Sequence, residues 1–211
     1  MSSRLAVFFV AIVIATATTG TIDSHAAEKD SDGYLPLFNG KDLTGWETTG
    51  TWVVEDDGVL ALKPKPGKRG IFSYRLFLWT KWTFRDFKLD FEFKLAEGGD
   101  SSVFLRSQSL GGFIEIELTD SYGKQGPLTT DDCGAVQKVS PPSKNMAKPA
   151  GEWNRMVIAC KGNLLQVELN GEQVIDLDYD ELGKSVPASG KIGLQDWGHP
   201  VWFRNIRIKK L

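Results

Sequence analysis

Histidine is scarce in this 211-residue sequence, which contains only His25 and His199. Two histidines so far apart exclude a three-histidine zinc site and the HExxH pattern of metalloproteases. The sequence also lacks a GxxxxGK[ST] phosphate loop, a GxGxxG fingerprint and a GxSxG elbow. Nucleotide-dependent chemistry and α/β-hydrolase chemistry therefore have no support in the sequence.

An excess of basic charge is likewise missing. Lysine and arginine number 25 against 27 aspartate and glutamate, and the two signs are interspersed along the chain. Nucleic-acid binding requires a basic stripe that neutralises phosphates. We therefore expect no nucleic-acid partner.

Long apolar runs are absent apart from one at the N-terminus, where residues 5–15 follow Arg4. This run is too short to span a bilayer, and residues 24–26 form a small-x-small site that suits signal peptidase. We predict a signal peptide over residues 1–26, cleaved after Ala26. The mature protein is then secreted or periplasmic, with no stable membrane span.

Cysteine is limited to Cys133 and Cys160. In an oxidising compartment two cysteines favour a single disulfide, and the alternative is a pair of buried thiols. The rest of the chain is long enough for one core and too short for two domains. We expect a polar, flexible lead at 27–33 and a single domain at 34–211.

Alternation of apolar and polar residues dominates the mature chain. It is clearest at 87–95 and returns at 114–118 and 165–169, where a tight turn at Asn170-Gly171 favours a hairpin into 173–175. Further short strands are expected at 52–55, 59–62, 102–106, 155–160, 191–195 and 201–209. Many short strands with almost no helix predict an all-β sandwich or barrel.

The main candidate site lies in the strand that begins at Phe113. Period-two geometry places Glu115 and Glu117 on one face, with α-carbons roughly 6.5–7 Å apart, so both carboxylates can converge on one sugar or one cation. Asp120 follows at the end of the strand as a third acid. The alternative is a solvated strand face.

Three other regions carry polar groups suited to a sugar. Ser102 and Arg106 share a face of their predicted strand, and both can hydrogen-bond sugar oxygens. Residues 195–200 gather Gln195, Trp197 and His199 at a break between strands, an arrangement that fits either a site or a turn. The aperiodic stretch 120–149 is a candidate binding loop.

Six segments in order resemble the 3-keto-disaccharide hydrolase family, across nearly all of the mature chain. They are 37–46 (LFNGKDLTGW), 101–106 (SSVFLR), 115–120 (EIELTD), 148–154 (KPAGEWN), 192–196 (IGLQD) and 201–206 (VWFRNI). The resemblance implies a concanavalin A-like jelly roll with two antiparallel sheets. It also implies activity on glycosides that carry a ketone at carbon 3 of the sugar.

In that chemistry the ketone acidifies the proton on carbon 2, a base removes it, the aglycone leaves from carbon 1, and water adds. The resemblance implies that Glu115 and Asp120 act as base or ligand and that His199 donates a proton. Arg106 and Gln195 would orient the sugar. No cofactor is identified; a divalent cation held by Glu115, Glu117 and Asp120 would polarise the ketone.

The sequence departs from the usual family pattern at three positions that we assign to substrate binding. Many members carry Gln in place of Glu117, Gly in place of Ser102 and His in place of Trp197. The predicted partner is a glycoside or oligosaccharide in the 3-keto form. Two alternatives are a non-catalytic carbohydrate-binding module and a jelly-roll glucanase that acts on unoxidised glycosides.

Overall fold

The structure is a computed structural model that describes residues 29–64, 76–108 and 112–211. These residues contain thirteen strands and no helix, which confirms the predicted all-β class. One sheet consists of β1 (Leu35–Pro36), β3 (Trp52–Val54), β4 (Leu60–Leu62), β6 (Phe87–Leu95), β9 (Asn154–Lys161), β10 (Leu164–Leu169), β11 (Glu172–Asp178) and β13 (Val201–Lys210). The other consists of β2 (Trp46–Glu47), β5 (Leu78–Thr80), β7 (Asp100–Ser107), β8 (Ile114–Thr119) and β12 (Lys191–Leu194).

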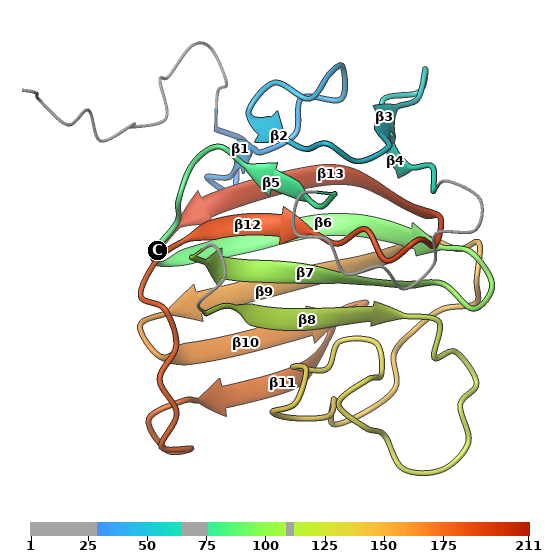
Figure 1. Ribbon diagram of the computed structural model, residues 1–211. Helices are drawn as coiled ribbons and strands as arrows, with labels where there is room; N and C mark the ends of the chain where they lie inside the picture. The colour runs from blue at the N-terminus through green and yellow to red at the C-terminus, as the bar shows by residue number, and fades with distance from the viewer. Residues whose placement is uncertain (1–28, 65–75, 109–111) are drawn as a thin grey trace, which may run out of the picture.

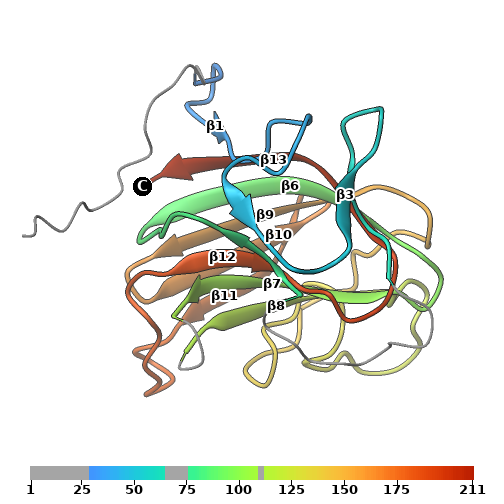
Figure 2. The same cartoon turned by 45° about the horizontal axis from the view of Figure 1, so that its top comes forward.

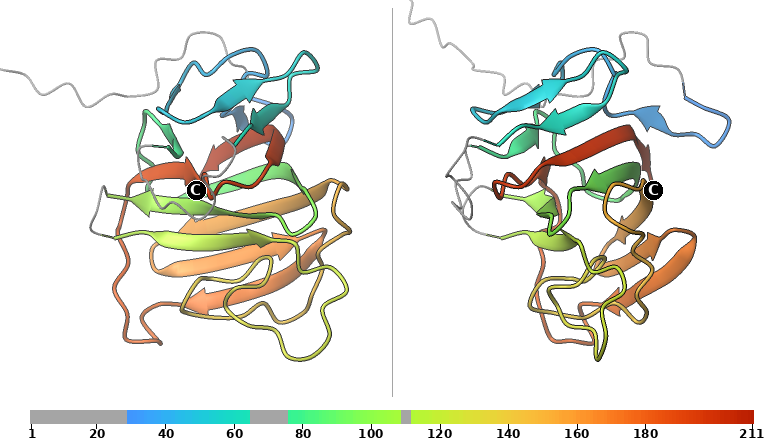
Figure 3. Two further views of the ribbon diagram at one scale, coloured as in Figure 1. Left: turned by 45° about the vertical axis from the view of Figure 1, so that its right-hand side comes forward. Right: turned by 90° about the vertical axis from the view of Figure 1, so that its right-hand side faces the viewer.

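The two sheets lie face to face, with β12, β7 and β8 in front of β6, β9 and β10 (Figures 1 and 3). The eight-stranded sheet runs in the order β11-β10-β9-β6-β13-β4-β3, and β1 pairs with the free part of β13. The five-stranded sheet runs β2-β5-β12-β7-β8. Figure 2 shows the N-terminal segment with β1 and β3 beside β13. Every pairing is antiparallel, so the architecture is the predicted sandwich.

The core fills the space between the sheets and follows the period-two alternation. On β6 the apolar residues at every second position are 5% exposed or less, and their neighbours are polar. The inward residues of β7 and β8 include Val103, Leu105, Ile114, Ile116 and Leu118. Because these strands use one face for the core, their other side chains must stand on the outer face of the five-stranded sheet.

The hairpin predicted at Asn170-Gly171 is present between β10 and β11. Both residues have positive φ angles, 53° and 87°, as a primed two-residue turn requires. The strands β1, β2 and β5 were not expected from the sequence. They are two or three residues long, too short for alternation to be visible.

The predicted signal peptide, 1–26, lies outside the described residues, as does the start of the predicted lead. The rest of the lead, 29–33, is held against the fold rather than loose. The Asp30 carboxylate accepts hydrogen bonds from the backbone N–H groups of Asp32 and Tyr34 and pairs with Arg207. In the described part of the chain, no helix has the length and apolarity needed to cross a membrane.

The predicted disulfide is absent. Cys133 and Cys160 are free thiols, each about 1% exposed or less, and both belong to the apolar core. Burial raises the pKa of each thiol to about 12, which keeps both protonated and unreactive. The positions of the two cysteines in the sequence could not show that their side chains pack in the core without forming a disulfide bond.

Candidate functional site

The candidate site lies on the outer face of the five-stranded sheet, where β7 and β8 run side by side. In their register Ser102 lies opposite Glu117, and Phe104 lies opposite Glu115. Strand alternation turns these four side chains away from the core. Glu115 and Glu117 therefore stand together on one face, as their spacing in the sequence predicts.

Glu117 is the most strongly perturbed acid of this face. It is only 4% exposed; one carboxylate oxygen accepts a hydrogen bond from Gln137 Nε2 at 2.8 Å, and the other accepts one from Ser102 Oγ at 3.2 Å. Burial, reinforced by the nearby negative charge of Glu115, raises the pKa of Glu117 to about 8. At neutral pH this carboxyl group is therefore mostly protonated and neutral.

Two further acids share the environment of Glu117. Burial raises the pKa of Glu115, opposed by a hydrogen bond from Ser102 and by the charge of Lys138. Burial also raises the pKa of Asp100, opposed by the charge of His199. We call Asp100, Glu115 and Glu117 the acidic cluster. Three neighbouring carboxyl groups with raised pKa values are a mark of functional sites.

A segment distant in sequence shields the cluster. Residues 134–137 run along the free edge of β8, with Gly134 donating to the Glu117 carbonyl at 2.8 Å and Gln137 to the Glu115 carbonyl at 3.0 Å. The Gln137 side chain then bridges Glu117 and Asp131. This segment belongs to the loop 120–149 that the sequence marked as a candidate binding loop.

Aromatic rings form the other half of the same face. Phe77, Trp79 and Phe104 pack with centroids 5.2–6.0 Å apart, and Phe113 lies 4.7 Å from Phe104. Trp79 lies over Gly193, where any Cβ would come within 2.3 Å of the indole ring. Phe104 lies opposite Glu115 in the register of β7 and β8, so the aromatic rings adjoin the acidic cluster on this face.

The segment after β12 contributes the amide and the histidine that the sequence singled out. The Gln195 N–H donates to the Ser102 carbonyl at 2.9 Å, so Gln195 lies next to Ser102 directly after the end of β12, and it is buried. His199 is partly exposed and lies within electrostatic reach of Asp100. Trp197 is partly exposed in the loop between β12 and β13.

Arg106 has a different place from the one expected. The register between β12 and β7 shifts at this point, and Arg106 adopts a positive φ of 50°, so it leaves the face of Ser102. Its guanidinium is 1% exposed and donates to the carbonyls of Arg85 (2.7 Å) and Gly162 (2.6 Å) and to Asp86 (3.1 Å). These contacts make Arg106 a structural clamp at the far end of β7.

Arg106→Lys is therefore expected to lower the free energy of unfolding by on the order of 3 kcal/mol, because an ammonium group cannot replace the fork of donors. Chemical denaturation measures this loss. Arg85→Lys, at an exposed neighbouring side chain, is the matched control and should be neutral. A variant with unchanged stability and weakened substrate binding would restore the sugar-orienting role.

Asp120 is also separate from the acidic cluster. Its carboxylate accepts a hydrogen bond from the Gly98 N–H at 2.9 Å and so fastens the turn between β6 and β7. Alternation puts it out of line with Glu115 and Glu117. Within the described ranges, no group of three or more His, Cys, Asp or Glu residues is placed to hold a metal ion, so the expected cation trio is not assembled.

Sequence reasoning missed Asp100, Asp131 and Gln137. Asp100 carried a usable signal, because it lies two residues before Ser102 and so belongs to the same face of β7. Asp131 and Gln137 carried none, since their place depends on how the loop folds back over β8.

Residues 33–209 match the model of the 3-keto-alpha-glucoside-1,2-lyase-like domain. The chain belongs to this family. The matched range includes strands of both sheets and the residues of the acidic cluster.

Individual relatives support the family assignment and the fold. A 3-keto-disaccharide hydrolase of Bacteroides thetaiotaomicron is 27% identical over 247 residues, covering 90% of this chain and 82% of the relative. A protein of Parabacteroides distasonis described as a candidate glycosyl hydrolase has a solved structure with a TM-score of 0.69 and 28% identity, covering 84% of this chain and 99% of that one. A β-glucanase of Bacillus licheniformis, at 16% identity and a TM-score of 0.55 with 84% and 97% coverage, shares the fold alone. The concanavalin A-like jelly roll is thus confirmed, in a chain similar to enzymes that act on glycosides.

Proposed function

We propose that this protein cleaves 3-keto glycosides by elimination and hydration at the acidic cluster. Removal of the proton on carbon 2 leaves an enolate, whose electrons expel the aglycone oxygen from carbon 1. Water then adds to carbon 1 and a proton returns to carbon 2. The net products are a free 3-keto sugar and an alcohol.

The observation that carries the proposal is the unequal environment of two neighbouring carboxyl groups. Glu117 is the more buried, with a pKa of about 8, whereas Glu115 is partly buried and has Lys138 and Ser102 to favour its charged form. Environments that push two carboxyl groups apart in pKa assign one as base and the other as acid. Glu115 is therefore the base that takes the proton from carbon 2.

Glu117 acts as a neutral hydrogen-bond donor to the enolate oxygen. A carboxylic acid kept protonated by its surroundings is a strong donor to developing negative charge. Gln195, buried just after β12, supplies a second donor to the sugar. Many family members carry Gln in place of Glu117. The role proposed for Glu117 accounts for this exchange, because a protonated glutamate and a glutamine have nearly the same shape and both donate a hydrogen bond.

His199 is proposed to return a proton to the departing aglycone oxygen. It lies within electrostatic reach of Asp100 in the acidic cluster, and an imidazole can carry and donate a proton near neutral pH. Its partial exposure leaves room for an aglycone of variable size. Ser102 contributes by holding Glu117 in position through its hydroxyl.

The test compares a 3-keto glucoside with the parent glucoside in deuterium oxide, with an enzyme-free control for spontaneous exchange. We expect aglycone release from the keto form only, with deuterium at carbon 2 of the product. Mass spectrometry measures both. Equal release from the parent glucoside would favour a glucanase, and binding without release would favour a carbohydrate-binding module.

Export is proposed as well, with cleavage after Ala26 and the mature protein in the periplasm or outside the cell. The family match begins at residue 33, after the predicted cleavage site, which leaves the apolar run 5–15 free to serve as a signal. Mass spectrometry of the protein from cell fractions would reveal its N-terminus. An intact Met1 in the cytoplasmic fraction would contradict export.

A further inference from the structure

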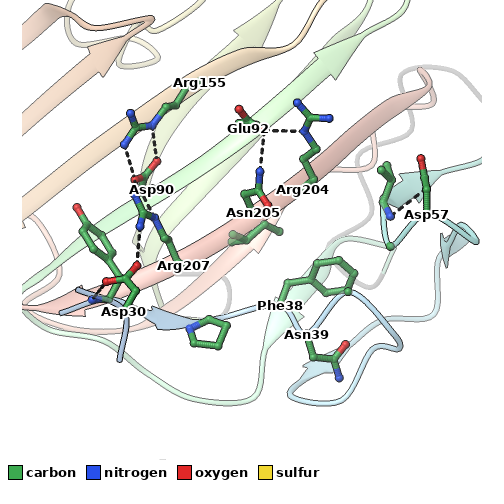
Figure 4. Close-up of a pocket in the computed structure, with 16 residues that line it drawn as sticks. Asp30, Phe38, Asn39, Asp57, Asp90, Glu92, Arg155, Arg204, Asn205 and Arg207 are labelled. Atoms are coloured by element: carbon green, nitrogen blue, oxygen red, sulfur yellow. Dashed lines mark hydrogen bonds and ion pairs between the residues drawn. The ribbon is translucent and has the colours of Figure 1, made fainter. Parts of the chain in front are cut away.

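A second polar site lies on the opposite side of the molecule from the acidic cluster. A cavity of about 840 Å³, which we call the groove, lies on the outer face of the eight-stranded sheet (Figure 4). Side chains of β6, β9 and β13 form its floor, and residues 38–40 and 57–59 form part of its rim. Its volume falls within the roughly 300–1,000 Å³ typical of small-molecule sites.

The floor is built around one buried carboxylate, Asp90. Arg155 donates to it from Nε at 2.9 Å and from Nη2 at 2.7 Å, and Arg207 donates from Nε at 3.0 Å and from Nη2 at 2.7 Å. Arg207 also pairs with Asp30 at the rim. Two guanidinium groups are thereby fixed in orientation before any ligand arrives, which lowers the entropic cost of binding.

A second set of hydrogen-bonded polar side chains continues the floor along β13. Glu92 accepts a hydrogen bond from Arg204 Nε at 2.6 Å and another from Asn205 Nδ2 at 2.9 Å. The Arg204 guanidinium also lies 4.1 Å from the ring centroid of Trp153. Asn205 has a positive φ of 54°, within the shifted register that separates Arg204 from Arg207. Figure 4 shows the outer nitrogen atoms of Arg204 turned away from Glu92.

Arg155 and Arg204, which both line the groove, keep donor atoms that the carboxylates do not use. Within the described parts of the chain, neither Nη atom of Arg204 has a hydrogen-bond partner, and neither does Nη1 of Arg155. The two side chains are 39% and 52% exposed. Held at one edge by a carboxylate and open at the other, each guanidinium presents N–H groups in a fixed plane.

The charges of the lining favour a neutral ligand. Three arginines face four carboxylates there, those of Asp30, Asp57, Asp90 and Glu92, for a net charge of 3 − 4 = −1. A site with this balance has no excess positive charge to attract an anion. It offers both donors and acceptors on a largely polar wall, which suits a ligand rich in hydroxyl groups.

We propose that this groove binds a neutral oligosaccharide through the open edges of Arg155 and Arg204, independently of the acidic cluster. Sugar hydroxyl groups accept from the guanidinium edges and donate to the rim carboxylates. The two sites lie on opposite sheets, so one saccharide chain can be held on the back of the domain while the front remains free for chemistry.

Isothermal titration of the mature protein with short neutral gluco-oligosaccharides of different linkage tests this proposal. The double variant R155K/R204K keeps both charges but removes the guanidinium edges, and is expected to bind about tenfold more weakly or worse. R85K is the matched control at an exposed arginine outside the groove and should bind like the wild type. Thermal melts of all variants check that each is folded.

The variant Glu115→Gln distinguishes binding in the groove from binding at the acidic cluster. Binding that survives in Glu115→Gln and is lost in R155K/R204K supports the groove. Binding that follows Glu115 instead overturns the proposal, as does the absence of binding by any neutral oligosaccharide. An oligogalacturonate is the charged comparator; preference for it over the neutral ligands would also overturn the proposal.

Discussion

Glu115→Gln is expected to lower the turnover number for a 3-keto glycoside by about 10²- to 10⁴-fold, the usual contribution of a general base. The amide cannot take the proton from carbon 2, while its shape and its contact with Ser102 are preserved. Because the lost interaction belongs to the transition state, the Michaelis constant should change little. Steady-state kinetics with a chromogenic 3-keto glucoside measures both quantities.

The matched control for this variant is Glu181→Gln, at an exposed glutamate between β11 and β12. It should leave turnover unchanged. A second control is exchange of the carbon-2 proton with solvent, which the Glu115 variant should lose together with aglycone release. If Glu115→Gln turned over normally, the base would have to be sought elsewhere on the sheet, beginning with Asp100.

Glu117→Gln is expected to stabilise the protein more at alkaline pH than at pH 5. The difference in free energy of unfolding between variant and wild type should grow by on the order of 4 kcal/mol between these two conditions. The pKa of Glu117 is about 8 in the folded chain, against an ordinary value of 4.5. Between these values the folded state binds the proton more tightly than the unfolded state does. Wild-type stability therefore falls as pH rises through this window, and the fall is complete above pH 8.

The glutamine variant lacks this titration, so the difference between the two proteins should grow from pH 5 to pH 9. Urea denaturation at several pH values provides the measurement, with Glu181→Gln expected to run parallel to the wild type. Activity gives a second readout. If Glu117 works as a neutral donor, the variant should keep most of the wild-type turnover. Above pH 8 its turnover should fall less than that of the wild type. Parallel stability curves for Glu117→Gln would show that the group is ionised in the fold.

The strands of this protein were predictable wherever their alternation runs for five residues or more. The segment 87–95 repeats its pattern over a full nine-residue strand, and β6 has those bounds. The Asn170-Gly171 turn was predictable because few other residues adopt two consecutive positive φ angles. The short strands β1, β2 and β5 were not, because their pairing is set by neighbours distant in sequence.

The placement of Glu115 and Glu117 on one face followed from the same alternation, and it is the part of the site that the sequence supplied directly. The sequence could not show how strongly each is desolvated. Burial of Glu117 depends on the segment 134–137 along β8, whose Gln137 contacts its carboxylate, and on Ser102 opposite it on β7. Both are tertiary contacts, invisible in the order of residues.

Alternation by itself determined that this is an all-β protein and that two acids share a strand face, because a strand of fixed pleat leaves no other choice. Family motifs along the chain added the chemistry to expect. Only the tertiary structure decided which polar groups meet. It turned Arg106 into a buried clamp at a shifted register, sent Asp120 to a turn, kept two cysteines apart as thiols, and brought Asp100 and Gln137 to Glu117. The reason is physical: local pattern fixes the direction of a side chain, whereas its solvation and its partners depend on what the rest of the chain packs against it.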